Sequence, residues 1–332
     1  MVKRIAFVLA AAVAGAPGTA VALAADPVPP VMAALGDSIS AGFNACGWYV
    51  SCTSRSWSAG DHPGVNSHYL RLLALGPAIK GHNRNFAVPG STSADMAAQA
   101  QKAVAAKAGY VTLLIGAQDA CVASESKMTP VATYRARIDR ALAVLAPSGA
   151  KVFAASIPDL KRLWRIGKDN VLAKSFWAIG GICPTMLANA GSDAKKDKAR
   201  RDRVRERVQE YNAQMAEACA AYGPGCRYDG GAVFSYPFTL DHVSKWDFFH
   251  PNADGQRALA QATFTNGFSF DRSPLAREDP LAQRKPEQDA PEQRTPPEEE
   301  PVPPPSPSAT PKPSLPADGA IAQWPAAGWS TQ

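Results

Sequence analysis

One short segment, residues 34–42, constrains the fold and the chemistry of this chain more than any other. The apolar run 31–35 stops abruptly at a Gly-Asp-Ser triplet, residues 36–38. A short apolar run bounded by turn residues is typical of a buried strand, and the glycine allows a sharp exit from it. Because open α/β sheets bind ligands at the carboxyl ends of their strands, we interpret Ser38 as a nucleophile at that edge. The triplet alone also fits an ordinary turn, so this interpretation depends on partners elsewhere in the chain.

The start of the chain predicts export. Residues 1–4 form a short basic start, residues 5–16 are apolar and small, and a small-x-small cleavage signal lies at residues 22–24. These features are typical of a secretory signal peptide, which we place at residues 1–24. Its apolar segment is too short to span a bilayer, and later segments fall short of the roughly 20 apolar residues that a transmembrane helix needs. The mature protein is therefore expected to be soluble, secreted and extracellular.

Cysteine usage agrees with export. An even number of cysteines in an oxidising compartment usually means disulfides, and the C-x-x-C spacing that would suggest a metal site does not occur. Two pairs are close in sequence, which leaves the third: Cys46–Cys52, Cys219–Cys226 and Cys121–Cys183. No metal or other cofactor is expected. Four histidines are expected to be surface or hydrogen-bonding residues without a catalytic role: His62, His68, His82 and His242.

Charge and composition divide the chain into two parts. Residues 31–270 hold 27 basic and 18 acidic residues, a balance of +9, and their length fits one domain with a single core. The tail, residues 271–332, holds 6 basic and 10 acidic residues and 15 of the 29 prolines, so it is expected to be disordered. An exported protein without a nucleic-acid motif is not expected to bind nucleic acid. The basic body could instead make peripheral contact with a membrane or the cell wall, where the tail could act as a spacer.

Strand and helix signals alternate along the domain, which predicts a parallel sheet covered by helices on both faces. Strands are expected at residues 31–35, 85–88, 110–115, 151–156 and 227–228. Helices are expected at residues 130–145 with Thr129 as N-cap, at 192–221, and at 253–264 with Asn252 as N-cap.

The helix expected over residues 192–221 is strongly basic in its first half. Residues 195–207 hold eight basic and three acidic residues. Such a face could bind anionic lipid headgroups. It could also be a solvated helix face with partial charge pairing, which is the interpretation we favour.

A motif near the end of the domain can supply the partners of Ser38. Asp247 and His250 are three residues apart, a spacing that puts both side chains on one side of a turn. An imidazole can take the proton of a serine hydroxyl, and a carboxylate fixes the tautomer of that imidazole and stabilises its charged form. Asp-x-x-His also occurs as a structural turn with a surface histidine.

Two loops that follow strands can donate hydrogen bonds to the oxyanion that forms when a serine attacks an ester. Gly90 follows the strand expected at residues 85–88, and a glycine allows the backbone to approach a substrate closely. Gln118 follows the strand expected at residues 110–115 and carries a side-chain amide. Each loop alone would be an ordinary turn.

Taken in order, these segments resemble the motif blocks of the SGNH hydrolases, also called the GDSL esterase/lipase family. The matching motifs are Gly36-Asp37-Ser38, Gly90, Gly116-x-x-Asp119 and Asp247-x-x-His250. The chain is similar to the secreted actinobacterial branch over about residues 31–268, including residues 156–160 and the cysteine pattern. The resemblance implies a flavodoxin-like three-layer α/β/α sandwich with a central parallel sheet. It also implies roles for the motif residues: Ser38 as nucleophile, His250 as base, Asp247 as its partner, and an oxyanion hole from the N–H groups of Ser38 and Gly90 and the side chain of Gln118.

One position departs from the family pattern. The family has asparagine where this chain has Gln118, and the extra methylene moves the amide outward by about one bond length. Because losing one oxyanion donor can cost about 100-fold in turnover, we expect a weakened or reshaped oxyanion hole.

The sequence thus predicts a secreted, metal-independent serine esterase or lipase, acting as a monomer on carboxylic esters of lipids or acylated glycans. The same triad could instead transfer the acyl group to an alcohol, as in an acyltransferase. A third alternative is a catalytically weak protein that binds the cell envelope. Five aromatic residues could line an acyl cleft or simply pack in the fold: Trp48, Tyr49, Trp57, Trp164 and Trp177.

Overall fold

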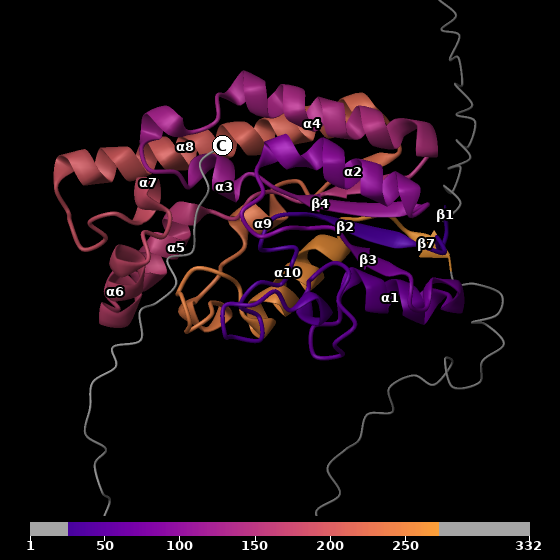
Figure 1. The fold of residues 1–332 in the computed structure, drawn as a ribbon, viewed down its shortest axis with the longest axis horizontal. Coiled ribbons are helices and arrows are strands. Elements are labelled where there is room, and N and C mark those ends of the chain that lie inside the picture. Colours follow the sequence, from indigo (N-terminus) through magenta and orange to yellow (C-terminus); the bar gives the residue numbers. More distant parts are fainter. Residues whose placement is uncertain (1–25, 272–332) are drawn as a thin grey trace, which may run out of the picture. The chain divides into compact units, whose positions relative to one another are not determined.

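The computed structural model describes residues 26–271, which contain a five-stranded parallel sheet (Figure 1). The strands are β2 (Met32–Gly36), β3 (Asn83–Asn85), β4 (Tyr110–Leu114), β5 (Lys151–Ala154) and β6 (Cys226–Tyr228). Their order, β3-β2-β4-β5-β6, is the flavodoxin-like order. Two more strands, β1 (Asp26–Pro27) and β7 (Phe270–Asp271), form a separate parallel pair. The predicted α/β class with a central parallel sheet is confirmed. The predicted signal peptide, and the predicted tail beyond residue 271, lie outside the described residues.

Helices cover both faces of the sheet, which gives three layers (Figure 1). One face carries α2 (Met96–Ala105), α4 (Val131–Leu145) and α8 (Lys195–Tyr222), and the other carries α1 (His68–Leu75) and α10 (Ala253–Phe264). The other α-helices are α3 (Ala117–Ala120), α5 (Leu160–Gly167), α6 (Val171–Ile179), α7 (Pro184–Leu187) and α9 (Ala232–Ser235). Single 3₁₀ turns span Thr53–Arg55, Pro77–Ile79, Ser93–Asp95, Glu125–Lys127, Ala146–Ser148 and Leu240–His242.

The alternation of side chains along the strands divides the core between the two faces. In β4, Val111 and Leu113 pack with the residues of α2, α4 and α8, whereas Tyr110 and Leu114 pack with those of α1 and α10. Every residue of β2 and β4 is buried, as is typical of central strands in a parallel sheet. The packing therefore fixes the carboxyl ends of these two strands, where the site lies.

Several predicted element boundaries were wrong. The strand expected at residues 151–156 ends at Ala154, and the helix expected from residue 192 begins at Lys195. The edge strand was expected at residues 85–88, but β3 spans Asn83–Asn85; beyond it Phe86 N and Val88 N still donate to β2, at Ala34 O and Gly36 O. The helix expected from residue 130 begins at Val131, because the extended backbone of Pro130 precedes it and Thr129 makes no side-chain cap. In contrast, α10 has its predicted bounds, and Asn252 Oδ1 accepts a hydrogen bond from Gly255 N at 2.9 Å.

Three disulfides join the same cysteine pairs that the sequence analysis expects. They are Cys46–Cys52, Cys121–Cys183 and Cys219–Cys226. The first closes a loop shortly after Ser38, the second joins the end of α3 to the start of α7, and the third joins α8 to β6. Among residues 26–271, the helices are too short or too polar to cross a bilayer.

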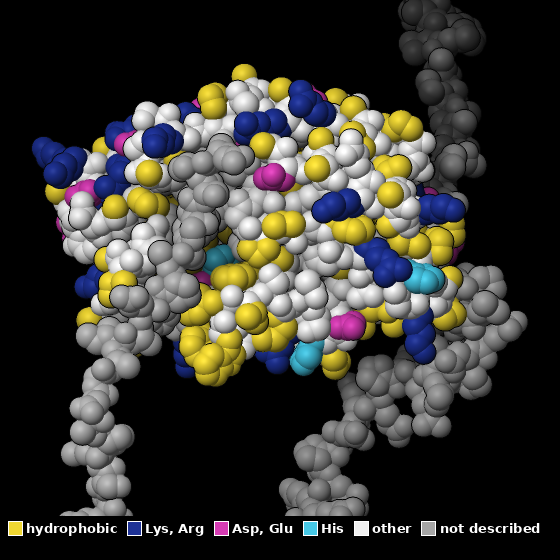
Figure 2. Space-filling view, viewed as in Figure 1, with side chains coloured by type: hydrophobic (Ala, Val, Ile, Leu, Met, Phe, Trp, Pro, Cys, Tyr) yellow, Lys and Arg dark blue, Asp and Glu magenta, His cyan; other side chains and the backbone are white. Residues whose placement is uncertain are grey.

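The arginines in the basic half of α8 are held by contacts within the fold. Arg201 is fully buried and donates to the carbonyl groups of Asn189 and Ser192. The other four pair with carboxylates: Arg200 with Asp197, Arg203 with Glu125, Arg205 with Asp159 and Arg207 with Glu210. On the face drawn in Figure 2, the Lys and Arg side chains of the described residues are spread out and do not form one patch. These contacts favour the interpretation of a charge-paired helix face.

Candidate active site

Ser38 follows β2 at the carboxyl edge of the sheet and is 4% exposed. Gly36 has a φ of +144°, and a Cβ there would lie 2.3 Å from the carbonyl oxygen of Leu114, so the approach of β2 to β4 requires glycine. The side-chain amide of Gln99, in α2, makes hydrogen bonds to both backbone groups of Gly36. Its Oε1 accepts from Gly36 N at 2.8 Å, and its Nε2 donates to Gly36 O at 3.0 Å. The backbone that leads into Ser38 is therefore fixed before any substrate binds.

A tight turn before α10 presents the second half of the site. Asp247 Oδ1 accepts from the backbone N–H groups of Phe249 at 2.9 Å and His250 at 3.1 Å, so the turn closes around its own carboxylate. Phe248 has a left-handed φ of 53°, and its carbonyl accepts a hydrogen bond from Trp177 Nε1 at 3.0 Å. A strained backbone held by surrounding contacts is common at functional sites.

The two halves meet in a continuous chain of hydrogen bonds. His250 Nε2 lies 2.8 Å from Ser38 Oγ, and His250 Nδ1 lies 2.6 Å from Asp247 Oδ2. Asn44 Nδ2 donates to the same oxygen of Asp247 at 2.6 Å, and the ring of Phe43 packs edge-on against the imidazole. The hydroxyl, imidazole and carboxylate thus have the order and spacing that removal of the hydroxyl proton requires.

The two carboxyl groups of the site differ in their protonation. Burial would raise the pKa of Asp247, but the hydrogen bond from His250 and those from the backbone outweigh this and hold its pKa below the usual value. Burial raises the pKa of Asp37 to about 7. Asp37 Oδ1 accepts from Ile39 N at 2.9 Å, whereas Oδ2 has no partner among the described residues. The carboxylate behind the imidazole is therefore ionised, and the one beside Ser38 takes up a proton near neutral pH.

The sheet order places the two predicted donor loops on either side of Ser38. Gly90 lies beyond β3 and Gln118 lies in α3 beyond β4, and these two strands are the neighbours of β2. Val88 N donates to Gly36 O at 3.1 Å, which ties the loop of Gly90 to the end of β2.

Asp119 links these two loops to each other. Its carboxylate accepts from Ser93 N at 2.8 Å and from Ser93 Oγ at 2.6 Å. Gly90 has a φ of +86° and is exposed, and the side chain of Gln118 is half-buried. The cavity in front of Ser38 is lined by Ala117 and by neither of the two predicted donors.

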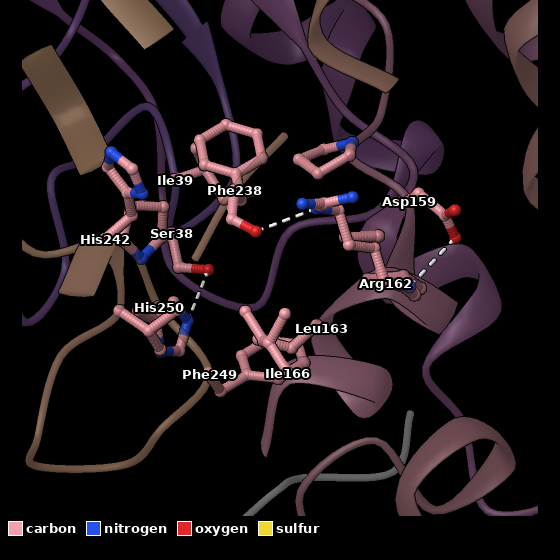
Figure 3. Close-up of a pocket in the computed structure, with 15 residues that line it drawn as sticks. Ser38, Ile39, Asp159, Arg162, Leu163, Ile166, Phe238, His242, Phe249 and His250 are labelled. Carbon is pink, nitrogen blue, oxygen red and sulfur yellow. Dashed lines mark hydrogen bonds between the residues drawn. The ribbon is translucent and has the colours of Figure 1, made fainter. Parts of the chain in front are cut away.

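That cavity has mostly apolar walls (Figure 3). Its apolar lining comes from the segment after β5, from α5 and from residues 238–251: Pro158, Leu160, Leu163, Ile166, Phe238, Val243, Phe249 and Pro251, with Ile39 and Ala117. Its polar lining consists of Ser38, Asp159, Arg162, His242 and His250. The aromatic residues proposed for an acyl cleft lie elsewhere: Trp57, Trp164 and Trp177 are buried in the core, and Trp48 and Tyr49 are exposed.

The other four histidines make hydrogen bonds with groups elsewhere in the fold. His68 is buried between Tyr110 Oη at 2.8 Å and Thr263 Oγ1 at 2.7 Å, and burial lowers its pKa to about 3. His62, His82 and His242 bond to backbone or hydroxyl groups near them. Within residues 26–271, no three His, Cys, Asp or Glu side chains gather in a group that could hold a metal ion.

Three residues of the site were missed by the sequence analysis. Asn44 donates a hydrogen bond to Asp247, Gln99 accepts one from Gly36 N, and Arg162 lines the cavity. A glutamine among the small apolar residues of α2 was a signal that could have been used, since a polar side chain on a buried helix face needs a partner. Asn44 and Arg162 carry no such local signal.

Fold and geometry together define a chain of the α/β class with a serine, an imidazole and a carboxylate in hydrogen-bonded order at the edge of its sheet. The profile of the GDSL-like lipase/acylhydrolase family matches residues 34–258, which include every residue of this site. The chain belongs to that family.

Curated proteins give no match to this chain. Among solved structures, it is similar to an alpha/beta hydrolase enzyme from the metagenome of Lake Arreo, Spain, with 18% identity and a TM-score of 0.42 over 71% of this chain and 93% of the other. A catalytic mutant of an acetylxylan esterase from Geobacillus stearothermophilus has 16% identity and a TM-score of 0.43 over 73% and 96%. A psychrotrophic esterase from Pseudoalteromonas sp. has 12% identity and a TM-score of 0.41 over 71% and 96%.

Proposed function

We propose that this protein is a serine hydrolase of carboxylic esters that works through an acyl-enzyme. Family membership supports the hydrolysis of esters. The observation that carries the assignment of residues is the chain of hydrogen bonds from Asp247 through His250 to Ser38, which opens into an apolar cavity.

In this mechanism Ser38 Oγ attacks the ester carbonyl while His250 Nε2 takes its proton. The imidazolium that forms is stabilised by Asp247, whose lowered pKa keeps it ionised. His250 then returns the proton to the departing alcohol, which leaves the acyl group on Ser38. Water activated by the same imidazole attacks the acyl-enzyme and releases the acid.

The oxyanion of each tetrahedral intermediate is assigned to three donors, the N–H groups of Ser38 and Gly90 and the side-chain amide of Gln118. The positions of these residues beyond three adjacent strands support this assignment. The positive φ of Gly90 supports it further, because it allows a backbone N–H to turn toward a substrate in an exposed loop.

We also propose that the enzyme is exported and acts outside the cell as a monomer, as in the secreted actinobacterial branch. Its three disulfides support an oxidising compartment. N-terminal sequencing of protein from the culture medium tests this, and a chain found in the cytoplasm with residue 1 intact would contradict it.

The catalytic assignment is tested by hydrolysis of p-nitrophenyl butyrate. Ser38→Ala is expected to lower kcat by about 10⁴-fold or more, because the nucleophile is lost. Ser124→Ala removes an exposed hydroxyl that does not line the cavity and is the matched control, with a rate close to that of the wild type. Equal rates in the wild type and Ser38→Ala would exclude the proposed function.

A further inference from the structure

Arg162 is a charged group in the catalytic cavity that the proposed mechanism does not use. It lies in the first turn of α5 and lines the same cavity as Ser38. Its Nε donates to the carbonyl of Phe238 at 2.8 Å, and Figure 3 shows the guanidinium across the cavity from His250. That bond fixes the guanidinium plane. Its two Nη groups make no hydrogen bond or ion pair with any residue between 26 and 271.

The acidic residue of the cavity does not neutralise Arg162. Asp159 Oδ2 lies 2.9 Å from Arg205 Nε and 3.3 Å from Arg165 Nη2. Asp159 Oδ1 accepts from the backbone N–H groups of Lys161 at 2.9 Å and Arg162 at 3.2 Å. Two other guanidinium groups thus balance this carboxylate, and the wall of the cavity retains a positive charge at Arg162.

The surroundings of that charge favour binding of an anion. Leu163, Ile166, Phe238 and Phe249 line the cavity beside it, so a bound substrate would displace most of the water around the guanidinium. A guanidinium with two free Nη groups matches the geometry of a carboxylate or phosphate, and such a charged hydrogen bond is stronger where water is excluded.

We propose that Arg162 forms an anion subsite, so that the preferred substrates are esters that carry a carboxylate or phosphate group on the acyl or the alcohol side of the ester bond. This inference deepens the proposed function and rests on it. The ester carbonyl lies at Ser38, the apolar part of the substrate lies against α5, and the anionic group lies at the Nη atoms of Arg162.

Two substrate pairs test the subsite and distinguish the side that carries the anion. Mono-p-nitrophenyl glutarate is compared with p-nitrophenyl butyrate, and 1-butyryl glycerol 3-phosphate with 1-butyryl glycerol. The wild type is expected to prefer the anionic member of at least one pair by about 10- to 100-fold in kcat/KM, the range of a charged hydrogen bond. Arg162→Gln is expected to lose this preference, measured as the ratio of kcat/KM between the two members of each pair.

Lys161→Gln is the matched control. It removes one positive charge from the same helix turn, but Lys161 pairs with Asp202 and does not line the cavity. This variant is expected to keep the preference for anionic esters. The subsite would be overturned if the wild type showed no preference for anionic esters, if Arg162→Gln kept that preference, or if Lys161→Gln lost it equally. Hydrolysis of the neutral esters would still support the proposed function in each of these cases.

Two further measurements complement these assays. The first does not depend on turnover, and the second does not depend on the folding of a variant. Calorimetric titration of the Ser38→Ala chain with monobutyl glutarate reports binding of an intact anionic ester, expected to be at least tenfold tighter than that of the neutral dibutyl ester. In the wild type, the anionic preference should shrink when NaCl rises from about 0.05 to 0.5 M, because salt screens the charge. Equal binding of the two esters, or a preference insensitive to salt, would also overturn the subsite.

Discussion

The two sides of Ser38 are built on different principles. On the side proposed for proton transfer, Asp247 receives four hydrogen bonds, from Asn44 Nδ2, from His250 Nδ1 and from the N–H groups of Phe249 and His250. On the side proposed to bind the oxyanion, Gly90 lies in an exposed turn, and the side chain of Gln118 makes no hydrogen bond with any residue between 26 and 271.

This difference follows from the cost of burying charge. An ionised carboxylate that is 2% exposed must be paired and hydrogen-bonded in the folded protein, so its surroundings cannot be loose. Donors in an exposed loop can bond to water until a substrate arrives. The groups proposed for proton transfer are therefore fixed in advance, whereas two of the three proposed oxyanion donors, Gly90 and Gln118, make fewer contacts within the fold.

The largest expected effect comes from breaking the fixed side. Asp247→Asn keeps the shape of the side chain but removes the charge and favours the wrong tautomer of His250, so kcat should fall by about 10³- to 10⁴-fold. The assay is p-nitrophenyl butyrate hydrolysis, with Asp241→Asn, an exposed carboxylate outside the cavity lining, as the matched control. A loss of less than tenfold would mean that the hydrogen bonds to Asp247 serve structure and not proton transfer.

A smaller effect is expected on the side proposed to bind the oxyanion. Gln118→Asn restores the family residue and should raise kcat by several-fold, whereas Gln118→Ala removes the donor and should lower it by about 100-fold. Gln101→Asn, an exposed position on α2, controls for the same change away from the site. An unchanged or lower rate in Gln118→Asn would show that the loop has already adapted to glutamine.

The last effect concerns stability, at Asp37, the residue before Ser38. Because burial raises the pKa of this carboxyl from 3.8 to about 7, the folded state holds a proton that the unfolded state releases between these values. Its stabilising contribution is complete below pH 3.8 and is lost as the pH rises through about 7.

Asp37→Asn does not titrate, so its advantage over the wild type in the free energy of unfolding should grow by about 2 to 3 kcal/mol between pH 5 and 8. Urea unfolding of both proteins at the two pH values measures this, with the disulfides intact. A constant difference between wild type and variant at both pH values would show that Asp37 titrates near its ordinary pKa.

Prediction from sequence succeeded where the signal is local. Strand β4 and helix α10 follow from hydrophobic pattern and a capping residue, and the predicted positions of both hold to within a residue. It missed the start of β3, since the edge strand Asn83–Asn85 is polar and carries no apolar pattern. The sequence also suggested Trp and Tyr residues as the lining of the cavity. The structure instead has Leu160, Leu163 and Ile166 of α5 there.

By itself the sequence determined which chemistry is available. A Gly-Asp-Ser triplet after an apolar run, an Asp-x-x-His pair and cysteines with close partners are local facts of residue type and spacing. Only the tertiary structure decided what holds and surrounds these groups. Asn44 reaches Asp247 across 203 residues of sequence, and Arg162 enters the cavity because α5 packs in front of Ser38. Such contacts depend on how the whole sheet and its helices pack, and they produce no periodic pattern in the sequence.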